Sequence, residues 1–156
     1  MRRGQAMVET LIAVLAIMLI FFGAFHLSRL VAARTLLDHA AARAARAKAV
    51  GFNDFMCEKS ARVAMIPVAG PRLWPEIDTF DEVSRVPIYL TAEDWGRANG
   101  ILEYEYWNTM DFDVRSGAGL VPVAESSIYL STPDYEAEGR AQVESHFPYY
   151  MFDQGL

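Results

Sequence analysis

The chain has 156 residues, 53% of them hydrophobic, and a formal net charge of −6, which allows one modest folded domain beside a membrane segment. The charge is unevenly divided, because residues 51–156 hold eighteen Asp or Glu against seven Lys or Arg, whereas residues 26–50 hold five Lys or Arg against one Asp. An acidic distal part argues against a nucleic-acid partner, which requires clustered basic side chains.

A long helix is predicted at the amino terminus. Residues 6–50 contain no Pro and a single Gly, Gly23, and they are rich in Ala and Leu. Gly51 then supplies a carboxyl-terminal stop. At about 1.5 Å per residue, such a helix is on the order of 65 Å long, roughly twice the thickness of the hydrocarbon core of a bilayer.

The first part of this helix has the composition of a membrane span. Residues 10–27 are apolar except for Thr10 and His26 at or near the two ends, and residues 10–25 carry no charge. A secretory signal peptide is the main alternative, but the apolar run is longer than usual and no clear cleavage site follows it. A buried core helix is disfavoured because no comparable apolar surface follows to cover it. We therefore expect a transmembrane helix over residues 5–27 and a helical stem over residues 28–50.

Small residues suggest a helix-packing face within the span. At helical spacing they fall on one broad face, which would let another helix backbone approach closely in lipid. Chance is the alternative reading, since Ala is abundant here. The face consists of Ala6, Ala13, Ala16 and Gly23.

Glu9 stands at the start of the apolar segment. A carboxylate deep in a bilayer costs on the order of 2.5 to 3.5 kcal/mol, so Glu9 should lie near the interface or have a partner. Its position near the start of the span permits the interfacial placement.

The residues in front of the span resemble a type IV prepilin processing site. Arg2 and Arg3 form a short basic leader, Gly4 is followed by Gln5, and Glu9 is the fifth residue after Gly4. Together with the apolar helix and its Arg-bearing, Ala-rich extension, this amino terminus is similar to TadE-like minor pilins or pseudopilins of the tight-adherence (Tad, or Flp pilus) system. The resemblance covers roughly the first fifty residues.

The resemblance implies a function and a set of partners. Prepilin peptidase would cleave between Gly4 and Gln5, removing residues 1–4, and Glu9 would pair with the amino-terminal ammonium of a neighbouring subunit. The expected partners are other pilin or pseudopilin subunits, the Tad inner-membrane platform, prepilin peptidase and the lipid bilayer. The chain would be a single-pass protein of the bacterial inner membrane that takes part in pilus assembly, protein secretion or adhesion, and it could enter an extracellular pilus.

The charges that flank the span and the family resemblance predict opposite orientations in the membrane. The flank after the span is more basic than the flank before it, so the positive-inside rule favours a cytoplasmic distal domain. The family resemblance implies the opposite, with a cytoplasmic amino terminus and residues 51–156 as an extracytoplasmic domain. We adopt the second orientation, because the amino-terminal segment is too short to form a folded domain outside the membrane.

The distal part predicts a pilin-like α+β domain, in which a small antiparallel sheet and short helices pack on the stem. A second helix is expected over residues 53–65, capped by Asn53 or Asp54, and a loop rich in Pro and acidic residues follows Gly70. The predicted strands cover residues 86–90, 111–114, 121–130 and 140–147. A capping box of Thr91 and Asp94 predicts a helix over residues 92–108.

Two further features concern burial. Cys57 is the single cysteine, and we expect a small buried residue rather than an intermolecular disulfide. Residues 147–152 are dense in aromatic side chains, which predicts core packing, with a docking patch as the alternative.

The sequence offers little support for catalysis, so we expect no enzyme activity, no cofactor and no metal. His26, His39 and His146 are widely separated, and Asp111 with Asp113 falls short of a calcium loop. No nucleophile-elbow, phosphate-loop or dinucleotide motif is present in the sequence.

The first functional hypothesis is therefore a minor pilin or pseudopilin that acts through helix packing and its exposed domain. A signal-anchored periplasmic binding or sensor domain unrelated to pili is the alternative, and a secreted enzyme with a cleaved signal is the third.

Overall fold

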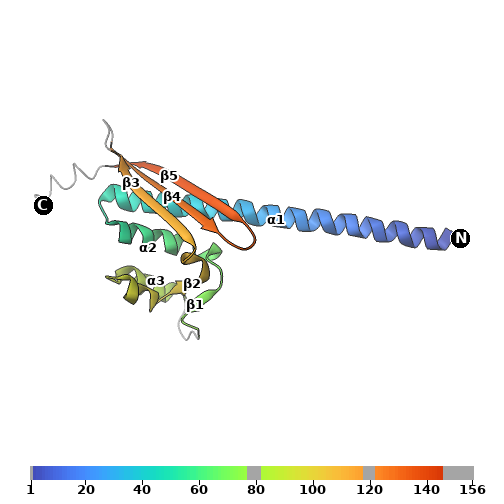
Figure 1. The fold of residues 1–156 in the computed structure, drawn as a ribbon, viewed down its shortest axis with the longest axis horizontal. Coiled ribbons are helices and arrows are strands. Elements are labelled where there is room, and N and C mark those ends of the chain that lie inside the picture. The colour runs from blue at the N-terminus through green and yellow to red at the C-terminus, as the bar shows by residue number, and fades with distance from the viewer. Residues whose placement is uncertain (1, 77–81, 118–121, 146–156) are drawn as a thin grey trace, which may run out of the picture. The chain divides into compact units, whose positions relative to one another are not determined.

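The computed structural model describes residues 2–76, 82–117 and 122–145, with side chains of the first helix from Ala6 onward. The chain divides into two compact units, residues 1–32 and 33–156. Helix α1 (Arg2–Val50) contributes to both, and the remaining elements belong to the second unit (Figure 1). The predicted α+β class, with a long amino-terminal helix, a small antiparallel sheet and short helices, is confirmed.

Helix α1 ends where the sequence predicts. Gly51 has a φ of 100°, in the left-handed region that favours glycine. The amide of Gly51 donates to the Lys48 carbonyl at 2.9 Å, and the amide of Phe52 donates to the Ala47 carbonyl at 3.1 Å. This pair of bonds is a Schellman motif, which satisfies carbonyl groups that the end of the helix leaves open.

Helix α2 (Asp54–Ala64) follows directly and confirms the predicted second helix. Asn53 is its N-cap, and its side-chain oxygen accepts a hydrogen bond from the amide of Met56 at 2.9 Å. A short 3-10 helix, η1 (Ile66–Val68), continues the chain. Strand β1 (Arg72–Trp74) then lies in the segment that the sequence predicted as a loop.

The main sheet has three antiparallel strands in the order β3-β4-β5. They are β3 (Met110–Gly117), β4 (Val123–Ser131) and β5 (Glu136–Glu144), and buried and exposed residues alternate along β4 and most of β5. This confirms the strands predicted around residues 111–114 and 121–130. The last strand begins at Glu136 rather than at residue 140, because Glu136 already pairs with Ser131 of β4.

The inner face of this sheet packs on the carboxyl-terminal part of α1. Gly139 of β5 lies so close to α1 that an added Cβ would overlap the backbone of Leu37 and Asp38. The amide of Arg140 donates to the Asp38 carboxylate at 3.1 Å. The first core cluster is buried between these elements and α2, and it contains Leu37, Ala40, Ala41, Ala44, Cys57, Ala61, Met65, Ile128, Leu130 and Ala137.

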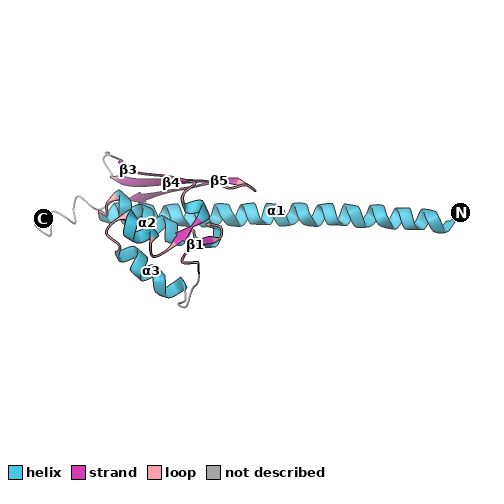
Figure 2. Cartoon of the chain, turned by 60° about the horizontal axis from the view of Figure 1, so that its bottom comes forward, coloured by secondary structure: helices cyan, strands magenta, loops and turns pink. Residues whose placement is uncertain are grey.

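Helix α2 also contacts a second core cluster, which lies toward α3 (Figure 2). Val63 and Ile66 pack against it, and its own members are Ala69, Tyr89, Ala92, Ala98, Leu102, Tyr104 and Trp107. Figure 2 shows the three-stranded sheet, α2 and α3 in successive layers. The second unit therefore has two small cores, with α2 between them.

A buried cation joins α2 to α3. The Lys59 ammonium donates to the carbonyls of Leu90 and Ala92 at 2.7 and 2.6 Å and lies 4.4 Å from the centre of the Phe55 ring. Burial lowers the pKa of Lys59. The two carbonyls stand at the end of α3, where a cation is favoured and where helical acceptors otherwise lack partners.

The strand predicted over residues 86–90 is wrong, since these residues lie in helix α3 (Glu82–Thr91). Val86, Tyr89 and Leu90 contact the second cluster, which is the spacing of one helical face. Pro87 lies inside the helix, where its missing amide removes one intrahelical hydrogen bond, so α3 forms in spite of this residue. Packing against the second cluster thus overrides the local β preference of this segment.

The long helix predicted over residues 92–108 is also wrong. Within this range only α4 (Trp95–Asn99) is α-helical, and its N-cap is Asp94, whose side chain accepts from the amide of Arg97 at 2.8 Å. Thr91 is the last residue of α3 and therefore cannot open a capping box. Beyond Gly100, the chain forms β2 (Glu103–Tyr104), which pairs with β1, and the 3-10 helix η2 (Glu105–Trp107).

Cys57 is fully buried, as predicted. Its Sγ donates weakly to the Phe52 carbonyl at 3.7 Å. Burial raises the pKa of the thiol to about 11, although Lys48 opposes the shift. The thiol is therefore protonated at neutral pH and shielded from oxidants, which agrees with a packing role. The aromatic segment 147–152 lies outside the described residues.

The close approach at Gly139 generates a stability prediction. We expect Gly139→Ala to lower the free energy of unfolding by about 2 to 3 kcal/mol, because the added methyl group forces the β5 and α1 backbones apart. Thermal unfolding of the full chain in detergent micelles measures the effect. Gly117→Ala in β3 is the matched control, because its Cβ would lie 3.4 Å from the Val123 carbonyl oxygen, at ordinary contact distance. Equal stability of the two variants would contradict the argument.

Candidate functional site

The described side chains of the first unit present a continuous apolar surface. Leu19, Ile20 and Met7 are more than 70% exposed, and the segment is long and apolar enough to cross a membrane by length and composition. A signal sequence passes the same test of composition. Exposed apolar surface of this extent needs a cover, which lipid or another helix supplies.

The predicted helix-packing residues all lie on α1 and are uncovered by the chain itself. Ala6, Ala13 and Ala16 are exposed. A Cβ added at Gly23 would meet no atom within 4 Å, so this position is open to a neighbouring helix. The Thr10 hydroxyl donates to the Ala6 carbonyl at 2.8 Å, which satisfies its polar group inside the helix.

Glu9 is an exposed residue of the same helix. It lies four residues, about one helical turn, after Gln5. The backbones of Gly4 and Gln5 belong to α1, and their side chains lie outside the described part. The structure therefore leaves the predicted processing site and the role of Glu9 as predictions.

The outer face of the three-stranded sheet is the second candidate surface. The register pairs Asp111 with Tyr129 and Tyr129 with Glu138, and it pairs Asp113 with Ser127. The charged residues of this outer face, which we call the acidic sheet face, are Asp111, Asp113, Glu125, Glu136, Glu138 and Glu144 together with Arg115 and Arg140. It carries six acidic residues against two basic ones.

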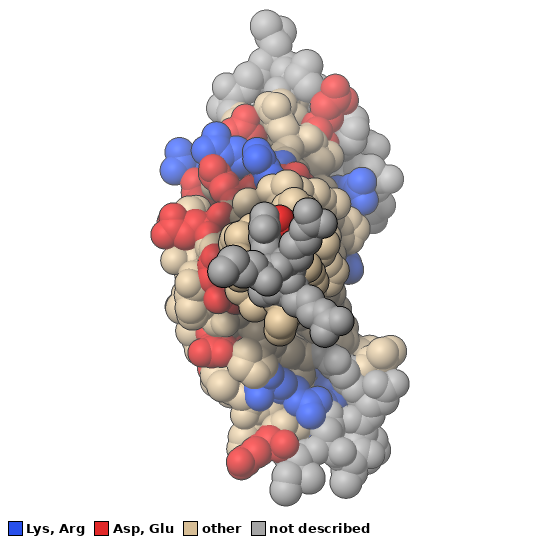
Figure 3. All heavy atoms as spheres, turned by 90° about the vertical axis from the view of Figure 1, so that its right-hand side faces the viewer, with Lys and Arg blue, Asp and Glu red and all other residues tan. Residues whose placement is uncertain are grey.

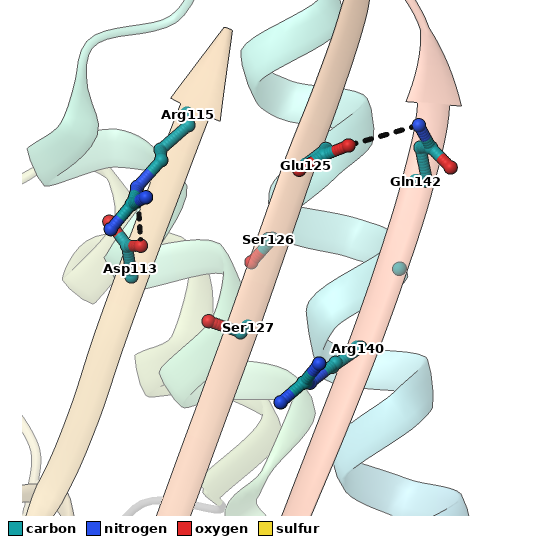
Figure 4. Close-up of a pocket in the computed structure, with 8 residues that line it drawn as sticks. Asp113, Arg115, Glu125, Ser126, Ser127, Arg140 and Gln142 are labelled. Carbon is teal, nitrogen blue, oxygen red and sulfur yellow. Dashed lines mark hydrogen bonds and ion pairs between the residues drawn. The ribbon is translucent and has the colours of Figure 1, made fainter. Parts of the chain in front are cut away.

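An open polar depression of about 520 Å³ lies on this face (Figure 4). Within it, Arg115 pairs with Asp113 at 2.7 Å, and the Gln142 amide donates to the Glu125 carboxylate at 3.0 Å. Arg140 pairs with Glu138 at 2.6 Å, and this hydrogen bond raises the pKa of the guanidinium. Because the two Arg side chains are already paired with carboxylates, the depression has little capacity to hold an anion.

Tyr129 lies at the centre of the acidic end of this face, beside Glu138. Its phenol donates to Glu136, which raises the pKa of Tyr129, and the charges of Glu136 and Glu138 act in the same direction. The phenol thus stays protonated and holds one carboxylate in place on the surface.

The described residues offer no grouping of three His, Cys, Asp or Glu side chains that could hold a metal ion. On the face drawn in Figure 3, Asp and Glu side chains lie beside Lys and Arg side chains at several places. The chemistry that these surfaces support is binding, through apolar contact on α1 and through charge on the sheet.

The acidic sheet face was missed by reasoning from the sequence alone. Its signal is the alternation of charged and apolar residues along β3, β4 and β5. The pairing that gathers the acidic residues on one side depends on the register of the sheet, which the sequence alone does not fix.

Comparison with known proteins identifies a family for the amino-terminal region. Residues 4–46 match the model of TadE-like proteins. The match includes the apolar segment and much of the helical stem, and it confirms the resemblance that the sequence predicted over roughly the first fifty residues. No curated protein and no solved structure matches the chain.

Proposed function

We propose that this chain, whose residues 4–46 match the model of TadE-like proteins, is a minor pilin-like or pseudopilin-like membrane subunit of the Tad pilus system. It assists assembly of a Tad-type pilus or a related secretion apparatus through protein contacts rather than through turnover. The uncovered apolar surface of α1, inside the region that matches the family, carries this proposal.

The apolar part of α1 supplies the contact within the membrane. The small residues at positions 6, 13, 16 and 23 permit close approach of a second helix, and lipid covers the larger side chains. The partners in this proposal are other pilin or pseudopilin subunits and the inner-membrane platform of the Tad system.

The proposal includes cleavage by prepilin peptidase. Cleavage between Gly4 and Gln5 removes the basic leader and creates an amino group one helical turn before Glu9. In the assembled state, Glu9 pairs with this amino group of a neighbouring subunit, so that two charges are desolvated together.

A mass measurement of the mature chain tests the cleavage. We expect loss of residues 1–4, and we expect Gly4→Ala to leave the full chain, because the peptidase recognises Gly before the cleaved bond. An intact wild-type chain would favour the signal-anchored alternative. Cleavage beyond about residue 25 would instead indicate a secreted protein with a removed signal peptide.

Substitution of Glu9 tests the charge pair. We expect Glu9→Gln to reduce the amount of subunit incorporated by about tenfold or more, because loss of a charge pair at the membrane costs at least about 1.4 kcal/mol. Incorporation is measured in the assembled fraction of cells that build the pilus. Glu9→Asp, which keeps the charge, is the control and should retain more incorporation. Equal incorporation of Glu9→Gln and wild type would remove the charge pair from the proposal.

The proposed orientation places the amino terminus in the cytoplasm and residues 51–156 in the periplasm. We expect protease added to cells with a permeabilised outer membrane to cleave the exposed parts of the second unit while α1 residues in the bilayer stay protected. Full protection of the second unit until the inner membrane is broken would indicate the opposite orientation. The charges that flank the span favour that orientation when they are considered alone.

A further inference from the structure

The second unit carries two surfaces of opposite charge. One is the acidic sheet face. The other, which we call the basic stripe, consists of His39, Arg43 and Arg46 on α1. The sheet packs on the opposite side of this part of the helix, where Leu37, Ala40 and Ala44 are buried and His39, Arg43 and Arg46 are exposed.

Helical spacing makes the basic stripe a continuous surface. Its residues stand at i, i+4 and i+7, which places them on one side of the helix. Within the described part of the chain, the side chains of Arg43 and Arg46 have neither a hydrogen-bond partner nor an ion-pair partner. Two guanidinium groups with five donors each are therefore available to carboxylates of another molecule.

The acidic sheet face has carboxylates in excess of its own cations. Arg115 and Arg140 each pair with a carboxylate of their own strand. Asp111 and Glu144 have no such partner among the described residues. The excess of four acidic residues makes this face a match for a basic surface and a poor match for a copy of itself.

We propose that the acidic sheet face of one copy of this chain docks on the basic stripe of a second copy. A symmetric contact of two sheet faces would bring two acidic surfaces together, and a symmetric contact of two stripes would bring Arg side chains together. The contact that joins opposite charges uses two different surfaces of the same chain.

The spacing between residues is similar on the two surfaces. Residues on one face of a strand repeat about every 6.7 Å, and residues on one side of a helix repeat about every 5.4 Å. The long side chains of Arg43 and Arg46 can adjust to the difference.

Because the two surfaces differ, each docked copy leaves one of them open, and a third copy can add in the same way. Repeated addition gives a ring or an open filament.

This contact does not rest on the proposed role in pilus assembly, because it involves charged residues of the second unit alone. It also differs from packing of the apolar part of α1, since only a charge contact weakens when salt is added. Salt dependence therefore separates the two modes of association.

Charge reversal tests the proposal on the full chain in detergent micelles. We expect wild-type self-association in analytical ultracentrifugation to weaken by about tenfold or more between 0.05 and 0.5 M NaCl, because surface charge contacts are screened. Arg43→Glu with Arg46→Glu reverses the stripe, and Asp111→Lys with Glu138→Lys reverses part of the sheet face. Each double variant alone should lose the salt-dependent association.

A mixture of the two double variants gives the decisive result. The intact sheet face of the stripe variant can then dock on the intact basic stripe of the sheet-face variant, so the mixture should recover salt-dependent association. Arg34→Glu with Arg97→Glu is the matched control for the stripe variant, because it makes the same change in net charge at exposed residues outside both surfaces, and it should keep most of the salt-dependent association.

Three outcomes overturn the proposal. One is a wild-type chain whose association does not respond to salt. Another is salt-dependent association that either double variant retains unchanged while its far-UV circular dichroism is that of the folded chain. The third is a mixture of the two folded double variants in which no complex forms.

Discussion

The close contact between the backbones of β5 and α1 organises the second unit. Gly139 allows the strand to reach Leu37 and Asp38 of α1 with no side chain between them, and the Asp38 carboxylate accepts from the amide of Arg140. Near the other end of β5, the Ser145 hydroxyl donates to the Ala49 carbonyl at 3.4 Å. The strand therefore follows α1, and the Ala residues of the helix provide the room for this approach.

Small side chains in the contact have an energetic cost. Ala buries little apolar area, so an Ala-rich interface gains less from the hydrophobic effect than a Leu-rich one. Backbone proximity offsets part of this loss through dispersion contacts and through the hydrogen bond between the Arg140 amide and Asp38. The core also uses Ile128 and Leu130 from the sheet and Met65 from the end of α2 to fill the remaining space.

Helix α2 joins the first core cluster to the second, through polar contacts as well as apolar ones. Lys59 binds two carbonyls at the end of α3. Arg62 pairs with Glu58 at 2.9 Å and stacks 4.2 Å from the centre of the Trp95 ring. Buried cations are tolerated here because their donors have acceptors and aromatic faces nearby, which compensates for lost hydration. The position of α3 and α4 therefore depends on directional interactions as well as on hydrophobic contact.

The sequence by itself determined the features that depend on local physics. Gly51 ends α1 because only glycine readily adopts its φ, Asn53 caps α2, and the apolar run forms a helix that is long and apolar enough to cross a membrane by length and composition. Only the tertiary structure decided that residues 86–90 are helical and that Asp94 opens α4, because contacts with Tyr89 and the second cluster outweigh weak local preferences. It also decided which carboxylates share a surface. That choice follows from strand register, in which a shift of one residue would turn every charged side chain of a strand to the other face.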